Sequence, residues 1–483
     1  MADDRQRMPE DVAIDAASVA MLKKADADGV PHDAFSRADE QGAPCAFGSN
    51  GTCCRICHLG PCKISEYVPG VCGATLDTVV ARNLLREVAA GAAAHSDHGR
   101  HLVLVLKAVA EGRSTDYAIR DEAKLRAAAR AWGIEDEGID TLALAAKVAD
   151  LFLSEFALQE GKLQTLRLAP KPRQGVWERL GIAPGGVDAT IVQALHRTHM
   201  GVDHEYKNIL RGALKASLAD GWGGSMIATA VSDILFGTPK PVRAKANLGV
   251  LEKDKVNVVV HGHEPALTEM LVAASRLPEI VAEAKAVGAA GVNLAGICCT
   301  ANEVLMRHGV PVAGNFLQQE LAIVTGAVEL MITDVQCCMA SLPEVAKCYH
   351  TKMVTSNPIA RNADAVAVHF DPANGMACAK DVLRMAIANY ARRDPAKVSI
   401  PDARQPLVAG FSNETIFNIL GGTFRKSFRP LNDAIITGRV RGVCGIVGCT
   451  NARKGRVDEY IVTLAKELIK RNIIVLKTGC AAV

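Results

Sequence analysis

Apolar residues in the first 240 positions recur mainly at helical spacing. They lie in stretches rich in Ala, Leu, Glu and Lys, which favour the helix. The spacing predicts helices over residues 11–24, 76–94, 123–132 and 141–157. Residues 45–72 are the exception, because this stretch contains several Gly and Pro residues together with six cysteines. We therefore expect a helical domain over residues 1–240 that carries one cysteine-rich loop.

From residue 256 onward, short β-branched runs are separated by longer helical stretches. The runs lie at 256–260, 292–297, 330–335, 353–355, 366–370, 407–411, 442–447 and 473–476. Helices are expected between them, for example over residues 264–287 and 301–308. Strands that alternate with helices indicate βαβ units and a parallel, doubly wound sheet.

The expected fold class is α/β with an N-terminal all-α domain. A proline-containing stretch at 371–403 marks a boundary between two Rossmann-like domains. The first covers residues 241–400, and residues 401–483 form the start of the second. We expect the second to be incomplete, because no helix follows its last strand to cover the sheet.

Composition narrows the range of functions. With 55 basic and 52 acidic residues the net charge is +3, which offers no electrostatic footprint for nucleic acid. No apolar stretch approaches the ~20 residues that span a bilayer. The polar, acidic N-terminus is also unlike a secretory signal. We expect a cytoplasmic protein with no membrane span and no nucleic-acid partner.

The 15 cysteines point to metal chemistry. Disulfides are rare in a reducing cytosol, where clustered cysteines more often bind metal or take part in catalysis. Burial as a small apolar side chain explains Cys348 and Cys378, since each is isolated in the sequence. It does not explain the two arrangements that hold most of the others.

The first arrangement is the block of Cys45, Cys53, Cys54, Cys57, Cys62 and Cys72. A C-x2-C turn lets two thiolates reach one metal centre, and two further cysteines complete a four-thiolate shell. The last four cysteines of the block fit a [4Fe–4S] cluster, which leaves Cys45 and Cys53. Two cysteines complete such a shell only with a second copy of the chain, so the block predicts a cluster shared across a homodimer axis. Zinc is the alternative, but it needs only four ligands.

The second arrangement repeats one placement five times in the α/β half. A soft metal ligand closely follows each of five predicted strands: His261-Gly262-His263, Cys298-Cys299, Cys337-Cys338, Cys449 and Cys480. Ligands of open α/β sheets bind outside the carboxyl ends of the strands, so these side chains are expected to converge. One His with several Cys suits an iron–sulfur cluster that carries another metal. We select His263 over His261, although the strand register allows either.

A third feature is the series His95, His98 and His101, spaced at i, i+3 and i+6. On a helix these residues lie along one slowly drifting face. Imidazoles with a pKa near ~6.5 can pass protons at neutral pH. The alternative is a polar, solvated helix face, and the spacing alone does not separate the two.

Together these motifs resemble the nickel-containing carbon monoxide dehydrogenases of anaerobes. The resemblance covers essentially the whole chain. It rests on residues 53–62 (CCRICHLGPC), the histidine series, 219–225 (ADGWGGS), 261–263 (HGH), 296–300 (GICCT) and 448–449 (GC). It implies a helical domain followed by two Rossmann-like domains, assembled as a homodimer.

The resemblance also implies a role for each candidate residue. Cys45 and Cys53 would bind the cluster shared between subunits. The relay [4Fe–4S] cluster would be bound by Cys54, Cys57, Cys62 and Cys72. The nickel–iron–sulfur active cluster would be bound by His263, Cys299, Cys337, Cys449 and Cys480. Its neighbours, rather than its ligands, would be Cys298, Cys338 and Cys444.

The implied activity is the reversible oxidation of CO with water to CO2, two protons and two electrons. Nickel would bind the CO carbon while a neighbouring iron activates hydroxide. His95, His98 and His101 would act catalytically as proton carriers. Electrons would leave through the relay and shared clusters to a ferredoxin-like carrier. An acetyl-CoA synthase or a hydrogenase is a further expected partner.

Two features depart from the family pattern. That pattern continues beyond Val483 with another cysteine ligand and a lysine, so the chain is expected to be a C-terminally truncated form. Leu104 stands where a fourth histidine can occur.

Two other functions are considered. One is a hybrid-cluster-type hydroxylamine reductase, which residues 296–299 (GICC) disfavour because that family has a Gly-Glu turn there. The other is a non-catalytic iron–sulfur electron-transfer fragment.

Overall fold

The structure is a computed structural model that describes residues 7–424, 427–453 and 455–483. It is a mixed α/β structure with a helical region and a sheet made mostly of parallel strands. Two compact units are present. The helical unit is Ala43–Thr238, and the α/β unit is Met1–Gly42 together with Pro239–Val483. The sequence pattern placed residues 1–42 in the helical domain, whereas the structure groups them with the sheet.

An eight-stranded sheet in the order β10-β3-β6-β5-β4-β7-β8-β9 forms the centre of the α/β unit. Its strands are β3 (Val242–Ala246), β4 (Val256–Gly262), β5 (Val292–Ile297), β6 (Val312–Gly314), β7 (Val328–Thr333), β8 (Lys352–Thr355), β9 (Val366–Ala367) and β10 (Gln405–Ala409). Neighbouring strands are parallel except β10, which pairs antiparallel with β3. The run at 407–411 was expected to open a second domain. The strand that overlaps it, β10, lies instead at the edge of the first sheet.

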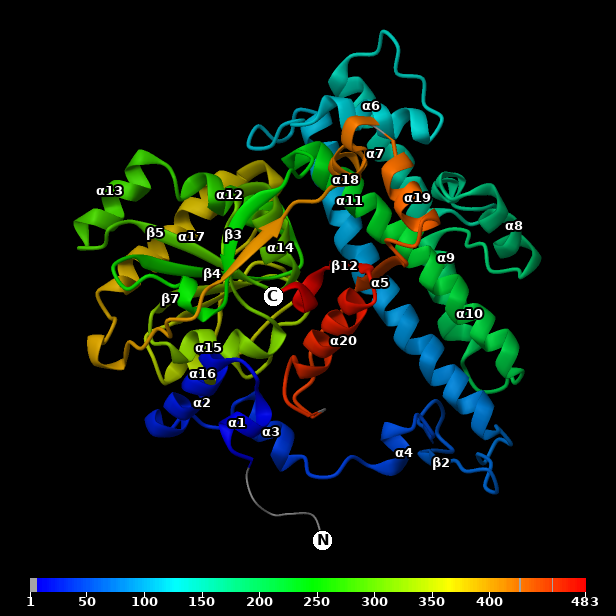
Figure 1. Cartoon of the computed structure of the whole chain (residues 1–483), viewed down its shortest axis with the longest axis horizontal. Helices are drawn as coiled ribbons and strands as arrows, with labels where there is room; N and C mark the ends of the chain where they lie inside the picture. The colour runs from blue at the N-terminus through cyan, green and yellow to red at the C-terminus, as the bar shows by residue number, and fades with distance from the viewer. Residues whose placement is uncertain (1–6, 425–426, 454) are drawn as a thin grey trace. The chain divides into compact units, whose positions relative to one another are not determined.

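Helices cover both faces of this sheet (Figure 1). One face carries α12 (Pro265–Ala274), α13 (Pro278–Ala286), α14 (Cys298–His308) and α17 (Gly375–Tyr390), and the other carries α2 (Ala16–Asp28), α15 (Gln319–Val324) and α16 (Leu342–Lys347). The single helix expected over 264–287 is divided into α12 and α13, because Pro278 begins a new helix. All residues of β4 and β7 are buried, which matches central strands covered on both faces.

The N-terminal helices explain why residues before Gly42 belong to the α/β unit. α1 (Pro9–Val12) leads into α2, whose Met21 and Leu22 are buried in one hydrophobic core with Leu321 and Val345. After α2 comes α3 (Ala34–Glu40), where the Arg37 guanidinium donates to Glu320 at 2.8 Å. Helical periodicity shows which face of a helix is buried but not what covers it, so the sequence pattern did not identify this partner.

The last part of the chain forms a second, smaller sheet. β11 (Gly442–Ile446) and β12 (Ile473–Lys477) pair in parallel, and α20 (Glu459–Lys470) connects them. Two short helices, α18 (Asn413–Leu420) and α19 (Arg429–Ile436), precede this βαβ unit.

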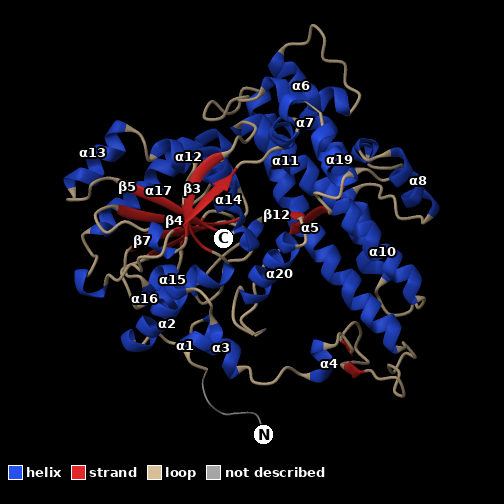
Figure 2. Ribbon diagram, viewed as in Figure 1, coloured by secondary structure: helices blue, strands red, loops and turns tan. Residues whose placement is uncertain are grey.

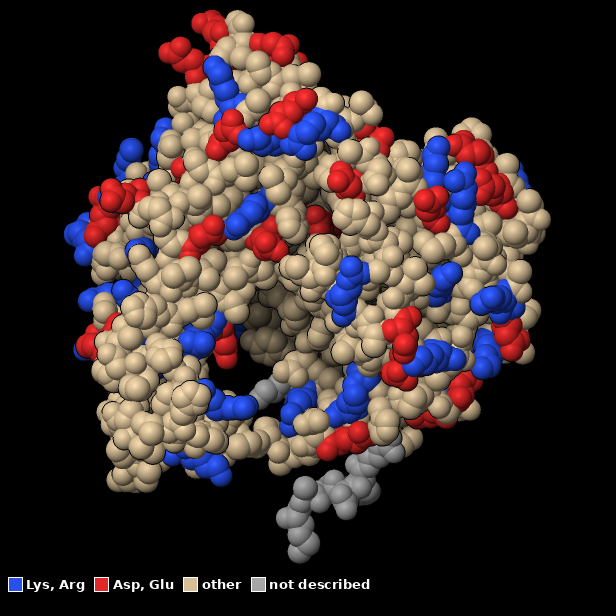
Figure 3. Space-filling model, turned by 180° about the vertical axis from the view of Figure 1, so that it is seen from behind, with Lys and Arg blue, Asp and Glu red and all other residues tan. Residues whose placement is uncertain are grey.

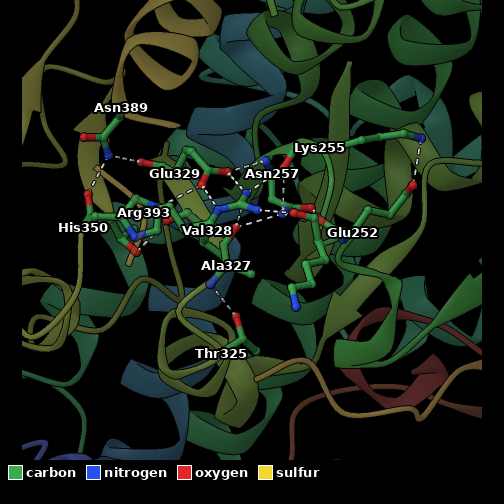
Figure 4. A network of polar contacts seen from close by, with 12 residues as sticks. Glu252, Lys255, Asn257, Thr325, Ala327, Val328, Glu329, His350, Asn389 and Arg393 are labelled. Atoms are coloured by element: carbon green, nitrogen blue, oxygen red, sulfur yellow. Dashed lines mark hydrogen bonds and ion pairs between the residues drawn. The ribbon is translucent and has the colours of Figure 1, made fainter. Parts of the chain in front are cut away.

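A buried polar network lies where β4 and β7 begin (Figure 4). The fully buried Glu329 carboxylate accepts the Asn257 amide at 2.6 Å and two Arg393 nitrogens at 2.7 Å. His350 Nε2 lies 2.8 Å from the same carboxylate. Arg393 also donates to the carbonyls of Lys253, Lys255 and Ala327. The buried negative charge is thus paired with a cation and surrounded by hydrogen-bond donors.

The helical unit is organised around α5 (Leu76–Ala110), drawn among the blue helices of Figure 2. Against it pack α7 (Thr141–Ala157), α9 (Val187–Arg197), α10 (Tyr206–Ala219) and α11 (Ser225–Phe236). The shorter helices of the unit are α4 (Ala46–Ser49), α6 (Glu122–Ala131) and α8 (Lys171–Arg179). The sequence pattern predicted only the first part of α5, whereas the helix continues through the histidine series.

A π-helical turn, Asp220–Gly224, joins α10 to α11 and lies against α5. Glycine is required at this contact. A Cβ on Gly224 would lie 2.8 Å from the Ser96 hydroxyl, and a Cβ on Gly99 would lie 2.9 Å from the Gly224 carbonyl. Because π turns inside helices often occur at functional sites, this close contact with the histidine-bearing helix is of interest.

The surface shows no dominant charge on the face drawn in Figure 3, where acidic and basic side chains are interspersed. None of the described helices is both long enough and apolar enough to cross a membrane.

Candidate metal centre

The five predicted soft ligands of the α/β unit all lie just beyond the carboxyl ends of strands. His263 follows β4, Cys299 follows β5, and Cys337 follows β7. Cys449 follows β11, and Cys480 follows β12 in the smaller sheet. In this arrangement the Cys337 Sγ lies 3.9 Å from His263 Nε2, and the Cys480 Sγ lies 3.9 Å from Cys298 Sγ. The structure therefore brings segments as much as 182 residues apart into contact.

The thiols lie close enough to change one another's pKa. Burial, together with the neighbouring thiols of Cys480, Cys337 and Cys449, raises the pKa of Cys299 to about 12. Hydrogen bonds from Cys337 and Cys480 lower the pKa of Cys449 far below its usual range. A negative charge on any of the three neighbours of Cys299 thus disfavours the ionisation of Cys299. Bound cations would remove this repulsion, because a metal stabilises several thiolates at once.

Several backbone conformations at this edge are unusual. Cys298, Gln336 and Cys337 have φ values of +62°, +64° and +60°. Non-glycine residues rarely adopt this left-handed region, and such conformations cost of order 1–3 kcal/mol each. Their concentration beside the candidate ligands indicates that the surrounding structure holds the cysteines in place at the expense of local stability.

The structure separates the two candidate histidines. His261 is 1% exposed, and its Nε2 lies 2.8 Å from the Gln319 amide oxygen. Burial lowers the pKa of His261 to about 4, which keeps this ring neutral. His263 instead lies beside the Cys337 thiol. The register thus places His263 with the cysteines, whereas His261 pairs with Gln319.

A polynuclear cluster suits this geometry better than a single ion. Among the residues that the structure describes, no three His, Cys or carboxylate side chains already surround one ion position. Ligands of a cluster bind separate metals, so their donor atoms need not meet at one point. One imidazole with several crowded thiols is a soft donor set of the kind that iron–sulfur clusters require. These residues therefore fit a nickel–iron–sulfur cluster.

Two polar residues of the site were not identified from the sequence. Asp334 is buried between β7 and Cys337, and its carboxylate accepts the His263 amide at 2.6 Å. Gln319 is fully buried and donates to the Cys337 carbonyl at 3.1 Å. An acidic residue between a buried strand and a cysteine was a usable signal for Asp334. Nothing in the sequence around Gln319 distinguishes it from a helix residue.

The N-terminal cysteine block forms a separate arrangement within the helical unit. Cys54 and Cys62 are paired across a short antiparallel ladder, β1 (Cys53–Cys54) with β2 (Cys62–Lys63). Cys72 packs in the same small core. The Asn83 amide, on α5, donates to the carbonyl of Cys53 at 3.1 Å and so anchors the block. Cys45 is exposed, and backbone amides of Gly48 and Phe47 lower the pKa of its thiol.

The histidine series lies on α5, where all three side chains are partly buried. His95 Nδ1 lies 2.9 Å from a carboxylate oxygen of Asp220, the first residue of the π turn. The Ser225 hydroxyl donates to the same oxygen at 2.9 Å. The hydrogen bond to Asp220 raises the pKa of His95. The first histidine of the series is therefore oriented by the π turn.

The chain belongs to the Prismane/CO dehydrogenase family, whose model matches residues 52–483. It is 50% identical to carbon monoxide dehydrogenase 1 of Methanosarcina mazei over 98% of this chain and 75% of that protein. It is 42% identical to the beta subunit of the carbon monoxide dehydrogenase/acetyl-CoA synthase of Moorella thermoacetica, over 98% of this chain and 71% of that protein. The resemblance inferred from the motifs is thereby confirmed.

Solved structures agree with this membership. A nickel-free carbon monoxide dehydrogenase from Thermococcus sp. AM4 superposes with a TM-score of 0.95 at 46% identity. The superposition covers 99% of this chain and 75% of that structure.

Proposed function

We propose that this chain is a carbon monoxide dehydrogenase, which oxidises CO with water to CO2, two protons and two electrons. The observation that carries the proposal is the convergence of His263 with the thiols of the strand ends at one edge of the α/β unit. Family membership and the 50% identical relative support the same activity. When bound, a nickel–iron–sulfur cluster supplies a site for the CO carbon and a Lewis acid that activates water.

The protein's own contribution is to hold and shield this cluster. The ligands that we propose are His263, Cys299, Cys337, Cys449 and Cys480. Their positions after strands of two different sheets fix the spacing of the donor atoms. The thiols of Cys298 and Cys338 are buried or partly buried next to them and are proposed as neighbours rather than ligands.

Proton transfer is assigned in this proposal to His95, His98 and His101. Support comes from their common helix and from the Asp220 carboxylate, which favours a protonated His95. A histidine with a raised pKa accepts a proton more readily near neutral pH, and successive imidazoles one helical turn apart can pass it along.

Electron transfer is assigned to the N-terminal block. Cys54, Cys57, Cys62 and Cys72 would hold a relay [4Fe–4S] cluster, and Cys45 with Cys53 would hold half of a cluster shared in a homodimer. The exposure of Cys45 is compatible with a ligand that faces a second subunit. A ferredoxin-like carrier would accept the electrons. An acetyl-CoA synthase or a hydrogenase would be a further partner, and a cytoplasmic location would keep these thiols reduced.

The proposal is tested by metal analysis together with CO-dependent dye reduction on anaerobically purified protein supplied with nickel. Bound iron and nickel with CO oxidation would support it. Iron without nickel, with reduction of hydroxylamine, would favour hybrid-cluster chemistry instead. Iron confined to the N-terminal block with neither activity would indicate an electron-transfer protein.

The shared cluster has its own test in the double variant Cys45→Ser with Cys53→Ser. We expect iron to fall by about half a [4Fe–4S] cluster per chain, because only the shared cluster loses its ligands. The matched control is Cys348→Ser, which removes a thiol that lies in neither cysteine arrangement. Unchanged iron in the double variant would contradict the shared cluster.

A further inference from the structure

Three ligand-bearing segments of the candidate metal centre meet at one buried carboxylate. We propose that Asp334 is a positioning residue, which holds the His263 turn, the start of α14 and the Cys337 loop in register for metal binding. The inference rests on the proposed function in so far as those segments carry the ligands. It adds a role for a residue that itself reaches no metal.

The hydrogen bonds of Asp334 connect segments that are distant in sequence. One carboxylate oxygen accepts the amide of His263 at 2.6 Å and also accepts the amide of Val335. The other oxygen accepts the Thr300 hydroxyl at 2.7 Å, within the first turn of α14 and next to Cys299. A single side chain therefore fixes the backbone on the way to His263 and Cys337 and a side chain beside Cys299.

The Asp334 carboxylate packs directly against Gly262. This residue lies between the two histidines with φ of +136°. A Cβ added to Gly262 would lie 1.7 Å from a carboxylate oxygen of Asp334. The Asp334 side chain thus occupies the space that any other residue at 262 would fill. Position 262 must therefore be glycine as long as the Asp334 carboxylate occupies this space.

Gln319 supports the Cys337 loop from a second direction. Its amide nitrogen donates to the Cys337 carbonyl at 3.1 Å, and its oxygen accepts the Met339 amide at 2.9 Å. Gln336 and Cys337 lie between these two supports and have positive φ. Because such backbone conformations persist only where surrounding contacts fix them, Asp334 and Gln319 account for the strained geometry of the loop.

The opposite end of β7 offers a matched control. Glu329 is also buried and lies on β7, the strand that Asp334 follows, and its carboxylate accepts the backbone amide of Asn257 on β4. It has no contact with a ligand-bearing segment among its described hydrogen bonds. If Asp334 only stabilised the fold, replacing either acid would change the same properties.

The test is an anaerobic Co²⁺ titration of the metal-free full chain, followed by thiolate-to-cobalt absorption. The signal of this centre is defined by subtracting a His263→Ala/Cys337→Ser variant. We expect Asp334→Ala to weaken Co²⁺ binding roughly 10- to 100-fold, as loss of a residue behind metal ligands generally does. Gly262→Ala should weaken it in the same direction, because the methyl group displaces the carboxylate. Glu329→Gln should lower the melting temperature and leave Co²⁺ affinity unchanged.

Asp334→Asn and Thr300→Val distinguish positioning from charge and from general instability. Asparagine keeps an oxygen for both backbone amides, so its affinity should lie closer to the parent than to Asp334→Ala. Thr300→Val removes one hydrogen bond without touching the other two and should have a smaller effect. Parent-like Co²⁺ binding by folded Asp334→Ala would overturn the inference, as would an equal loss in Asp334→Asn or in Glu329→Gln. Absence of nickel and CO activity in the parent would overturn the proposed function alone, since Co²⁺ binding is measured independently.

Discussion

The two ends of strand β7 place buried acids in opposite environments. Where the strand begins, Glu329 is surrounded by donors from Arg393, His350 and the Asn257 amide. Beyond its carboxyl end, Asp334 precedes a loop with two positive φ values and lies near a group of closely spaced thiols. Only about five residues of one strand separate the two environments.

This difference indicates that the two ends of the strands serve different purposes. A buried charge that is paired and fully hydrogen-bonded keeps its place, and removing one partner is strongly destabilising. The thiol edge has the reverse property, because charge on the neighbouring thiols disfavours the ionisation of Cys299 until cations bind. The amino ends of the strands therefore maintain the fold, and the carboxyl ends are prepared for a ligand.

The largest effect is expected from Cys337→Ser. CO oxidation should fall to background, because a serine oxygen is a poor ligand for iron or nickel in a thiolate cluster. The free energy of unfolding of the metal-free chain should stay equal or rise, since one member of a crowded thiol group is removed. The two measurements are dye reduction with CO and chemical denaturation. Retained activity, or a large loss of stability without metal, would erase the contrast between the two edges.

The second effect is expected from Arg393→Met at the opposite edge. This variant leaves the fully buried Glu329 without its cation and should lower the free energy of unfolding by about 3–5 kcal/mol. Nickel and iron per folded chain should not change. Arg404→Met is the control, because that arginine is half exposed and pairs with the exposed Asp402. A cost as small as that of the control would show that the Glu329 network does not maintain the fold.

The sequence predicted much of this division, but not all of it. Periodicity predicted β5 and α7 with the bounds that the structure has. It missed β6, which has three residues, and β3, which alternates partly exposed positions. The placement of soft ligands after strands was predictable because parallel strands end at a common edge.

What supports the ligands was not predictable in the same way. Asp334 and Gln319 act through hydrogen bonds to backbone groups that lie close only after the sheet has formed. The packing of α2 on the sheet likewise depends on a partner some 300 residues away in the chain. A pattern of residue types records which positions are buried or soft, but it does not record which segments meet.

The smallest effect is expected for the His95–Asp220 pair of the helical unit. It is a single ion pair, and the His95 side chain is 45% exposed. The hydrogen bond to Asp220 raises the pKa of His95 above its value in the unfolded chain. The stabilisation by this pair is therefore complete below about pH 6.5 and is lost as the pH rises through the folded-state pKa. Melting temperatures of Asp220→Asn should fall below those of the parent at low pH and approach them at high pH.

Asp188→Asn provides the comparison that makes this pH dependence specific. Asp188 accepts a hydrogen bond of 2.7 Å from Arg100, which lies on α5 with His95. The Arg100 guanidinium stays charged at every pH of the experiment. The difference between Asp188→Asn and the parent should thus be constant between about pH 6 and pH 9, because neither an aspartate nor an arginine titrates in that range. If both variants gave the same flat difference, His95 would not carry the proton in the folded chain, and the first step of the proposed proton series would have to begin elsewhere.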